Sequence, residues 1–376
     1  MSWVTWRQFR PQALAGFGVL AALAVLMLVT GLHLRDVYDS SGIAKCSAAG
    51  TCPRGVEEHF GNTYRLLRVL LGDVTIVAPA LVGMFWGAPL ISRELENGTF
   101  RLAWTQSVSR VRWLAVKVLI VGAAAVLVCL LYSLLFTWWV APVQHVELNR
   151  FEPGVFDQRG IVVIGYAAFA FALGLFAGAV TRRTLLAIAV TLLAFIGVRL
   201  GLALGVREHL VTPTHKTIPA VDARVGLIAT PAGVVPEAGI PPSIPNAWAL
   251  SARIVDKHGH PVSESALARF VRAECPGAEE PPKPPVPGPG TTRPAPESIE
   301  RCFTLLSQRY DVLVAYQPAD RYWLFQGLET AIFGGLALLL IAACFWWIGR
   351  DAPRRGPAFT IARRRGAFGA PRAGAA

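Results

Sequence analysis

Residues 118–140 read VLIVGAAAVLVCLLYSLLFTWWV and carry no charged side chain. An α-helix rises about 1.5 Å per residue, so about 20 apolar residues cross the roughly 30 Å hydrocarbon layer of a bilayer. Further stretches of this kind lie at 13–32, 74–91, 160–180, 184–205 and 326–348, the last two with one charged residue each, Arg199 and Glu329. The sequence therefore predicts an all-α integral membrane protein with six transmembrane helices.

The composition supports this prediction. Of 376 residues, 53% are hydrophobic and only 16% are charged, whereas an average soluble chain has roughly 25% charged residues. These values exclude a soluble enzyme, a secreted disulfide scaffold and a nucleic-acid-binding module. No Walker A, HExxH, GxSxG or GxGxxG pattern occurs, so we predict no catalytic residue.

The basic residues predict the orientation of the chain. If the N-terminus is cytoplasmic, the inner segments hold 16 Lys and Arg against three acids, which accounts for the net charge of +12. An excess of Lys and Arg in short loops marks the cytoplasmic side. We therefore expect both termini in the cytoplasm, and the tail 349–376 beside anionic membrane lipid rather than nucleic acid. The inner segments are 1–12, 92–117, 181–183 and 349–376.

The segment 1–12 precedes the first span and suits a helix lying on the inner leaflet. Pro11 is expected to end this helix. The alternative is an ordinary basic flank with tryptophans at the membrane interface. The residues that would anchor the helix are Trp3, Trp6, Arg7 and Arg10.

A loop of 120 residues, 206–325, separates spans five and six and predicts either a large extracellular domain or a loosely ordered cap. Nine of the 21 residues in 276–296 are proline, which predicts an extended insert. Before it, 248–256 resembles a structured segment that ends in a turn at 258–261. After it, 299–316 is expected to form a helix that leads back to the membrane.

The cysteines divide by location. Cys129 and Cys344 lie in spans and are expected to pack as small apolar side chains. Two disulfides are plausible on the outer side, within the pairs Cys46 with Cys52 and Cys275 with Cys302. We predict no metal site, because no CxxC spacing occurs and the nearby Asp256, His258 and His260 fit a solvated turn better.

The two charged residues inside spans allow two interpretations. Arg199 is close enough to the outer face to extend its side chain to the headgroups, and Glu329 lies at the outer start of span six. The alternative is that they line a polar cavity. The second span contains Pro79 and Pro89, and we expect it to be kinked.

The inner loop between spans two and three, 91–117, reads ISRELENGTFRLAWTQSVSRVRWLAVK. Gly98 is a natural helix end, a short helix from Thr99 would present Phe100 and Trp104 on one face, and Ser109 would cap the next helix. A short helix held between two spans is suited to transmit a movement of a soluble partner to the transmembrane helices. A solvated turn is the equal alternative on physical grounds.

This loop resembles that of the ABC-2 type transporter permeases, which carry an E-x-E-x-G-T pattern followed by Ser-Arg and a Lys that opens span three. The runs 3–8, 85–89 and 316–323 look like actinobacterial members. The large loop before span six departs from many relatives. The matching residues are Glu94, Glu96, Gly98, Thr99, Ser109, Arg110 and Lys117.

The resemblance implies an exporter subunit in a bacterial plasma membrane. It would pair with a second permease, identical or different, and bind a cytoplasmic ABC ATPase that holds ATP and Mg. Residues 99–106 would be the coupling helix, with Glu94, Glu96, Gly98, Thr99, Phe100 and Trp104 at the ATPase interface. The cargo is not predicted. The alternative function is a membrane sensor or enzyme with a ligand-binding extracellular domain.

Overall fold

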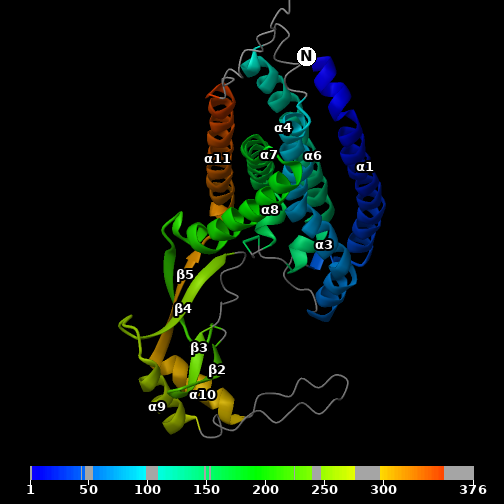
Figure 1. Cartoon of the computed structure of the whole chain (residues 1–376). Helices are drawn as coiled ribbons and strands as arrows, with labels where there is room; N and C mark the ends of the chain where they lie inside the picture. The colour runs from blue at the N-terminus through cyan, green and yellow to red at the C-terminus, as the bar shows by residue number, and fades with distance from the viewer. Residues whose placement is uncertain are drawn as a thin grey trace, which may run out of the picture.

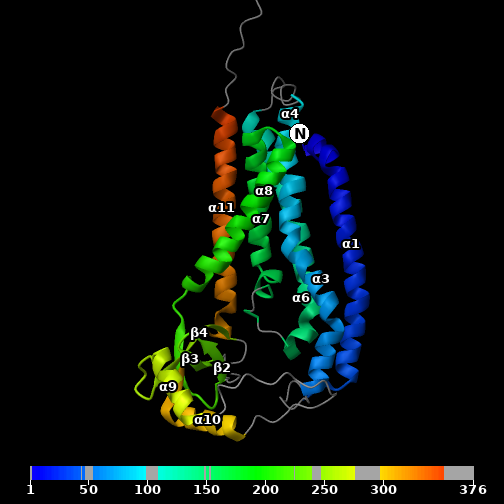
Figure 2. The same cartoon turned by 60° about the horizontal axis from the view of Figure 1, so that its bottom comes forward.

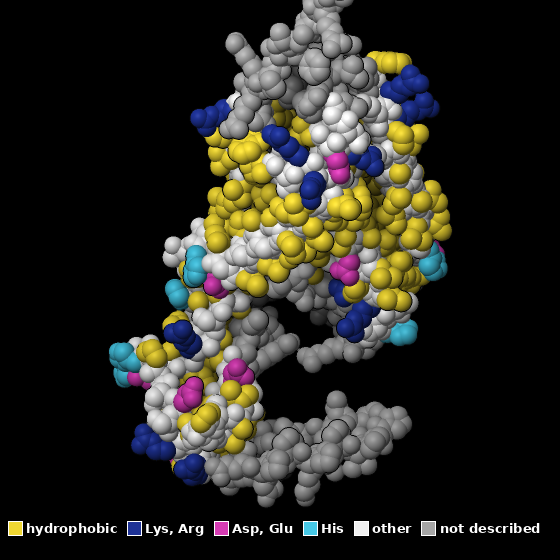
Figure 3. All heavy atoms as spheres, viewed as in Figure 1, with side chains coloured by type: hydrophobic (Ala, Val, Ile, Leu, Met, Phe, Trp, Pro, Cys, Tyr) yellow, Lys and Arg dark blue, Asp and Glu magenta, His cyan; other side chains and the backbone are white. Residues whose placement is uncertain are grey.

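The computed structural model describes residues 2–43, 45–46, 54–98, 109–147, 150–151, 154–223, 225–238, 247–275 and 297–350. Six helices in these ranges are long and apolar enough to cross a membrane, which confirms the six predicted spans. Side-chain colouring shows a hydrophobic band around them, with charged residues gathered toward its two ends (Figure 3). The spans run Thr5–Ser40, His59–Glu96, Arg110–Val143, Val162–Thr181, Thr184–His209 and Ala319–Arg350.

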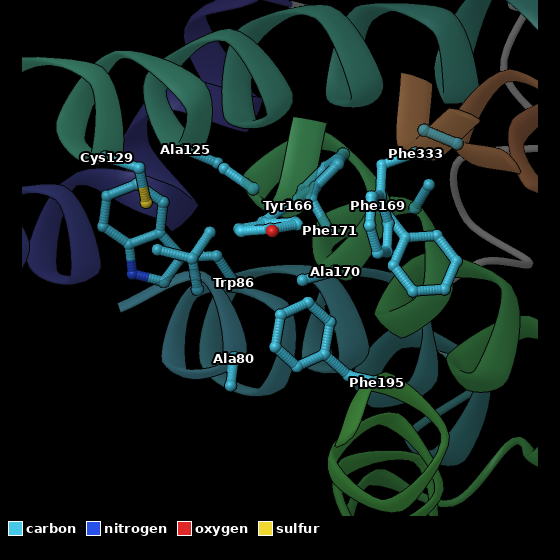
Figure 4. Packing of buried hydrophobic residues seen from close by; sticks show 14 of the residues in the cluster. Ala80, Trp86, Ala125, Cys129, Tyr166, Phe169, Ala170, Phe171, Phe195 and Phe333 are labelled. Atoms are coloured by element: carbon cyan, nitrogen blue, oxygen red, sulfur yellow. The ribbon is translucent and has the colours of Figure 1, made fainter. Parts of the chain in front are cut away.

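The fourth span, α7 (Val162–Thr181), is the centre of the bundle (Figure 1). Its most apolar stretch is 78% buried, against 11% for that of the first span. Tyr166 and Phe169 of α7 pack on Phe333 with ring centroids 4.8 and 5.4 Å apart (Figure 4). The helices of the other spans are α1 (Ser2–Ser40), α3 (Arg54–Val82), α4 (Ala88–Glu96), α6 (Arg110–Glu147), α8 (Thr184–Gly201) and α11 (Tyr322–Arg350).

Helix α1 does not stop at Pro11, so the expected break there is wrong. Proline removes one backbone donor, but buried side chains on both sides hold this helix in place. Phe9 lies edge-on to Trp86 at 4.9 Å, and Ala13 is also buried. A separate interfacial helix is therefore absent from the described residues, and the segment 2–12 forms the first turns of α1.

Span two is interrupted by a π-helical segment, η1 (Gly83–Gly87), between α3 and α4. Its glycines allow close contact with α7, because a Cβ on Gly83 would lie 2.5 Å from the Ala170 carbonyl oxygen. On α7, a Cβ on Gly178 would lie 2.5 Å from the Ala88 carbonyl oxygen. Small residues let transmembrane helix backbones approach in this way. Span two is therefore a helix in two parts, and its interruption packs closely against the backbone of α7.

The region between spans five and six contains a sheet, so the all-α prediction is wrong there (Figure 2). Side chains in β5 alternate, with Val312 and Val314 buried, as expected for a strand with one covered face. The predicted helix 299–316 becomes a strand in its second half. The elements are β1 (Thr214–Pro219), β2 (Val225–Thr230), β3 (Gly233–Ala238), β4 (Trp248–Asp256), α9 (Glu264–Glu274), α10 (Glu297–Arg309) and β5 (Tyr310–Gln317).

These elements, residues 214–317, form what we call the strand-bearing domain. An antiparallel sheet of order β1-β5-β4 and a β2-β3 hairpin pack with α9 and α10 around a hydrophobic core of their own. A disulfide joins Cys275 to Cys302. The described residues therefore form a folded domain rather than a loose cap. We call the bundle end next to this domain the domain end and the opposite end, where α4 finishes and α6 begins, the loop end (Figure 1).

Candidate coupling site and a buried charge cluster

Glu94 at the loop end forms an ion pair with a buried lysine. The Lys117 Nζ lies 2.5 Å from the Glu94 Oε1, and the two side chains are 3% and 16% exposed. The same ammonium lies 3.5 Å from the Leu90 carbonyl oxygen and 4.6 Å from the centre of the Trp113 ring. The pair therefore ties α4 to the first turns of α6.

Glu96 contacts the start of another helix. Its Oε2 accepts hydrogen bonds from the Thr184 backbone N–H at 3.2 Å and the Thr184 hydroxyl at 2.8 Å. Thr184 opens α8, so the carboxylate lies at the positive end of the helix dipole and takes one of its free N–H groups. The Ser92 hydroxyl lies 3.0 Å from that of Thr184. Glu96 therefore ties α4 to α8.

The residues around these acids follow the sequence expectations in part. Gly98 ends α4 with a φ of +70°, and the Ser109 hydroxyl accepts a hydrogen bond from the Arg112 N–H at 3.3 Å, so both caps are confirmed. Thr99, Phe100 and Trp104 lie outside the described residues.

The first turns of α1 lie beside this site. Trp3 and Trp6 are 65% and 51% exposed, and the Arg7 guanidinium lies 5.3 Å from the centre of the Trp3 ring. Arg10 is also exposed. A depression of about 330 Å³ separates α1 from α4; its lining includes Thr5, Gln8, Phe9, Gln12, Arg93, Glu94 and Asn97.

The sequence also predicted disulfides and a solvated turn without a metal. Cys46 follows α1, and Cys52 lies outside the described residues. Within the described ranges, no group of three or more His, Cys, Asp or Glu could hold a metal ion. The Asp256 Oδ1 instead accepts the backbone N–H groups of His260 at 2.8 Å and His258 at 2.9 Å. These hydrogen bonds, chiefly that from His260, lower the pKa of Asp256 below its ordinary value.

A cluster of charged side chains is buried at the domain end. The Arg207 Nε and Nη2 donate to the two carboxylate oxygens of Glu329 at 2.9 and 3.0 Å, and Nη2 also donates to the Asp157 Oδ1 at 2.5 Å. The Tyr166 hydroxyl lies 2.7 Å from Glu329 Oε1 and 3.0 Å from Asp157 Oδ1. Arg199 completes the cluster, with its Nη2 3.7 Å from the Asp157 Oδ2.

Burial of this cluster shows that the first interpretation of Arg199 and Glu329 is wrong. Arg199 is 8% exposed and Glu329 is fully buried, so neither extends to headgroups. Two arginines face two carboxylates, and such burial is tolerated only when charges are paired and hydrogen-bonded. The cluster draws on α7, α8, α11 and two 3-10 turns, η2 (Phe156–Gln158) and η4 (Arg207–His209).

Sequence reasoning missed three members of this cluster. Asp157 and Arg207 lie just outside predicted spans, and Tyr166 is an apolar-looking residue within one. The usable signal was the pair Arg199 and Arg207, eight residues apart. In an undisturbed helix they would point about 80° apart, and the wider π-helical turn η3 (Leu202–Val206) between them takes up part of that rotation.

Comparison with known proteins identifies the membrane part of the chain. A family model described as ABC-2 membrane transporter related matches residues 17–207. No curated protein and no solved structure that was compared with the chain matches it. The matched segment begins in α1 and ends at Arg207 of the buried cluster.

Proposed function

The chain belongs to the ABC-2 membrane transporter related family, and we propose that it is the permease subunit of an ATP-driven exporter in a bacterial plasma membrane. It is a multi-pass membrane protein with six spans. In the proposal both termini are cytoplasmic, a second permease completes the path, and a separate ABC ATPase binds and hydrolyses ATP with Mg. The chain itself transmits movement and forms the path.

The observation that supports coupling is the pair of ties at the loop end. Glu94 connects α4 to α6, and Glu96 connects α4 to α8. A push on the loop that follows Gly98 would therefore reach three spans together. Both carboxylates have partners within the chain, so we assign them to positioning the loop. The ATPase contacts are then assigned to Thr99, Phe100 and Trp104.

The first turns of α1 fit a supporting role. Exposed Trp3 and Trp6 with Arg7 and Arg10 suit the lipid interface and an adjoining ATPase surface.

Export and an apolar or amphipathic cargo agree with the family and with the state of the charges inside the spans. The buried charges Arg199 and Glu329 are engaged with other residues of the chain.

The test is purification of the full chain from its native membrane in mild detergent, with mass spectrometry and an ATPase assay on the eluate. An ABC ATPase should co-purify with the wild type. Glu94→Lys should weaken its retention by displacing the loop, and Glu94→Lys/Lys117→Glu should restore it. Glu237→Lys, at an exposed site in β3, is the matched control. Purification without any ATPase would contradict the proposal.

A second candidate is a sensor, favoured by one observation. A depression of about 440 Å³ lies on the sheet face not covered by α9 and α10, and its lining includes Glu208, His209, His215, Arg253 and Leu313. Deletion of 276–296 separates the candidates, because the Cys275–Cys302 disulfide keeps the flanking elements together. An exporter should retain ATPase binding and activity, whereas a sensor that reads ligands through the insert should lose its response.

A further inference from the structure

The domain end of the bundle divides into two groups of helices. One hydrophobic cluster there joins α1, α3 and α6 through residues such as Leu34, Leu71 and Phe136. A separate one joins the segment before α7 to α11 through Phe151, Phe156 and residues of α11, with Trp248 of the strand-bearing domain packed against it. Neither cluster contains buried residues of the other group's helices. A third cluster joins spans two and three to α7, α8 and α11, and polar contacts add to it at this end.

Arg199 makes such a contact. Its Nη1 donates a hydrogen bond to the Ile76 carbonyl oxygen of α3 at 3.0 Å, while its Nη2 lies 3.7 Å from Asp157. Its guanidinium also lies 4.5 Å from the centre of the Tyr166 ring. One side chain of α8 thus reaches both the charge cluster and the backbone of span two.

Pro79 lies in α3 close to this bond, three residues after Ile76. Proline has no N–H, so the Thr75 carbonyl, next to that of Ile76, loses its helical donor. In membrane helices such turns persist where neighbouring groups supply new hydrogen bonds. Arg199 donates to the neighbouring Ile76 carbonyl and so contacts this weakened turn. This turn lies in α3, on the domain-end side of η1. The segment η1 separates the two parts of span two.

The rest of the cluster does not depend on Arg199. Asp157 still accepts hydrogen bonds from Arg207 and Tyr166 when Arg199 is removed, and Arg207 keeps both oxygens of Glu329. Arg207 donates three hydrogen bonds to the two carboxylates, whereas Arg199 makes one longer ion-pair contact with Asp157. Arg199 is therefore the more weakly held of the two arginines, and the one that we expect to change partner.

We propose that Arg199 is a positioning residue for transport, a latch that holds the domain-end half of span two against spans four to six. Its release lets the domain-end half of α3 move away from α8 and the charge cluster. Pro79 and η1 form the flexible joint within span two. The inner half of span two remains tied through Glu94 and Glu96. The role in the cycle rests on the proposed transport function, but the contact itself is testable without cargo.

The test uses thiol labelling of the full chain in detergent by a water-soluble maleimide. Thr75→Cys places the probe next to Ile76; Thr75 is 1% exposed, and its hydroxyl makes no hydrogen bond among the described residues. Thr191→Cys, in a fully buried position of α8, is the matched control. Each probe is compared with and without Arg199→Leu, in a parent in which Cys129 and Cys344 are alanine.

Arg199→Leu should raise the labelling rate at position 75 about tenfold, the expected loss of a charged hydrogen bond, and leave position 191 unchanged. Arg199→Lys, which keeps a donor, should label closer to the wild-type rate. Unchanged labelling at position 75, or an equal rise at both positions, would overturn the latch.

Adding the co-purified ATPase and ATP to the wild-type Arg199 protein separates the two proposals. A rise at position 75 with ATP supports release during the cycle. If Arg199→Leu has its effect but ATP has none, the latch stands as a closing contact and its release by ATP is refuted. The absence of any co-purifying ATPase would refute the proposed function alone.

Discussion

Replacing Glu94 with glutamine leaves the Lys117 ammonium buried without its carboxylate. Lys117 is 3% exposed, so water cannot take over from the lost partner. Removing one member of a buried ion pair costs about 3–5 kcal/mol. The Leu90 carbonyl and the Trp113 ring remain as weaker partners. We therefore expect Glu94→Gln to lower the free energy of unfolding by about 3 kcal/mol, the low end of that range.

The double variant Glu94→Gln/Lys117→Met removes both charges and nearly preserves volume. Its cost should be under about 1.5 kcal/mol, because exchanging a buried pair for neutral groups is often close to neutral. The measurement is unfolding of the full chain in mixed detergent micelles for the wild type, both single variants and the double variant. Single effects that add to the double effect within about 0.5 kcal/mol would refute the buried tie.

The same variants separate two roles of Glu94. If the carboxylate only positions the loop, the double variant should retain the ATPase partner while Glu94→Gln loses part of it. If Glu94 touches the ATPase directly, both variants should lose the partner equally. The mutant cycle and the co-purification thus test the geometry and its use separately.

Three further predictions concern packing, the disulfide and pH. Gly174→Ala should destabilise the bundle by about 2–3 kcal/mol, because its Cβ would meet the backbone of span two, whereas Gly197→Ala, with open space around it, should stay within about 0.5 kcal/mol in the same unfolding assay. Replacing Cys275 and Cys302 together by serine should cost about 3–4 kcal/mol, measured as protease resistance of the strand-bearing domain in the full chain; unchanged resistance would contradict a stabilising crosslink. The pKa of Asp256 is lowered by backbone N–H donors, so its contribution to stability is present above its ordinary pKa of about 4 and lost as pH falls; hydrogen-exchange protection of that turn should drop on acidification, and Asp256→Ala should abolish the pH dependence.

Local chemistry explains which parts were predictable. Gly98 and Ser109 were placed at helix ends from residue type alone, because a left-handed turn and a hydroxyl cap are local requirements. Pro11 misled the prediction for the opposite reason. Its local preference was overridden by Phe9 packing on Trp86, a residue far along the chain.

The sequence identified the segment that contains the candidate site but not the contacts between its side chains and other helices. Glu94 and Glu96 were recognised in the loop, yet the pattern did not show that one pairs with Lys117 and the other with Thr184. Strand β5 shows the same limit, because its pairing with β1 and β4 depends on segments far away in the sequence.

The sequence by itself determined the six spans, because a bilayer requires each long apolar segment to satisfy its own backbone hydrogen bonds as a helix. Tertiary structure alone decided which charges meet. Arg207 and Glu329 are separated by the whole strand-bearing domain, and they pair because folding brings the segments on either side of that domain to α7. Once buried there, each charge is stable only beside the other.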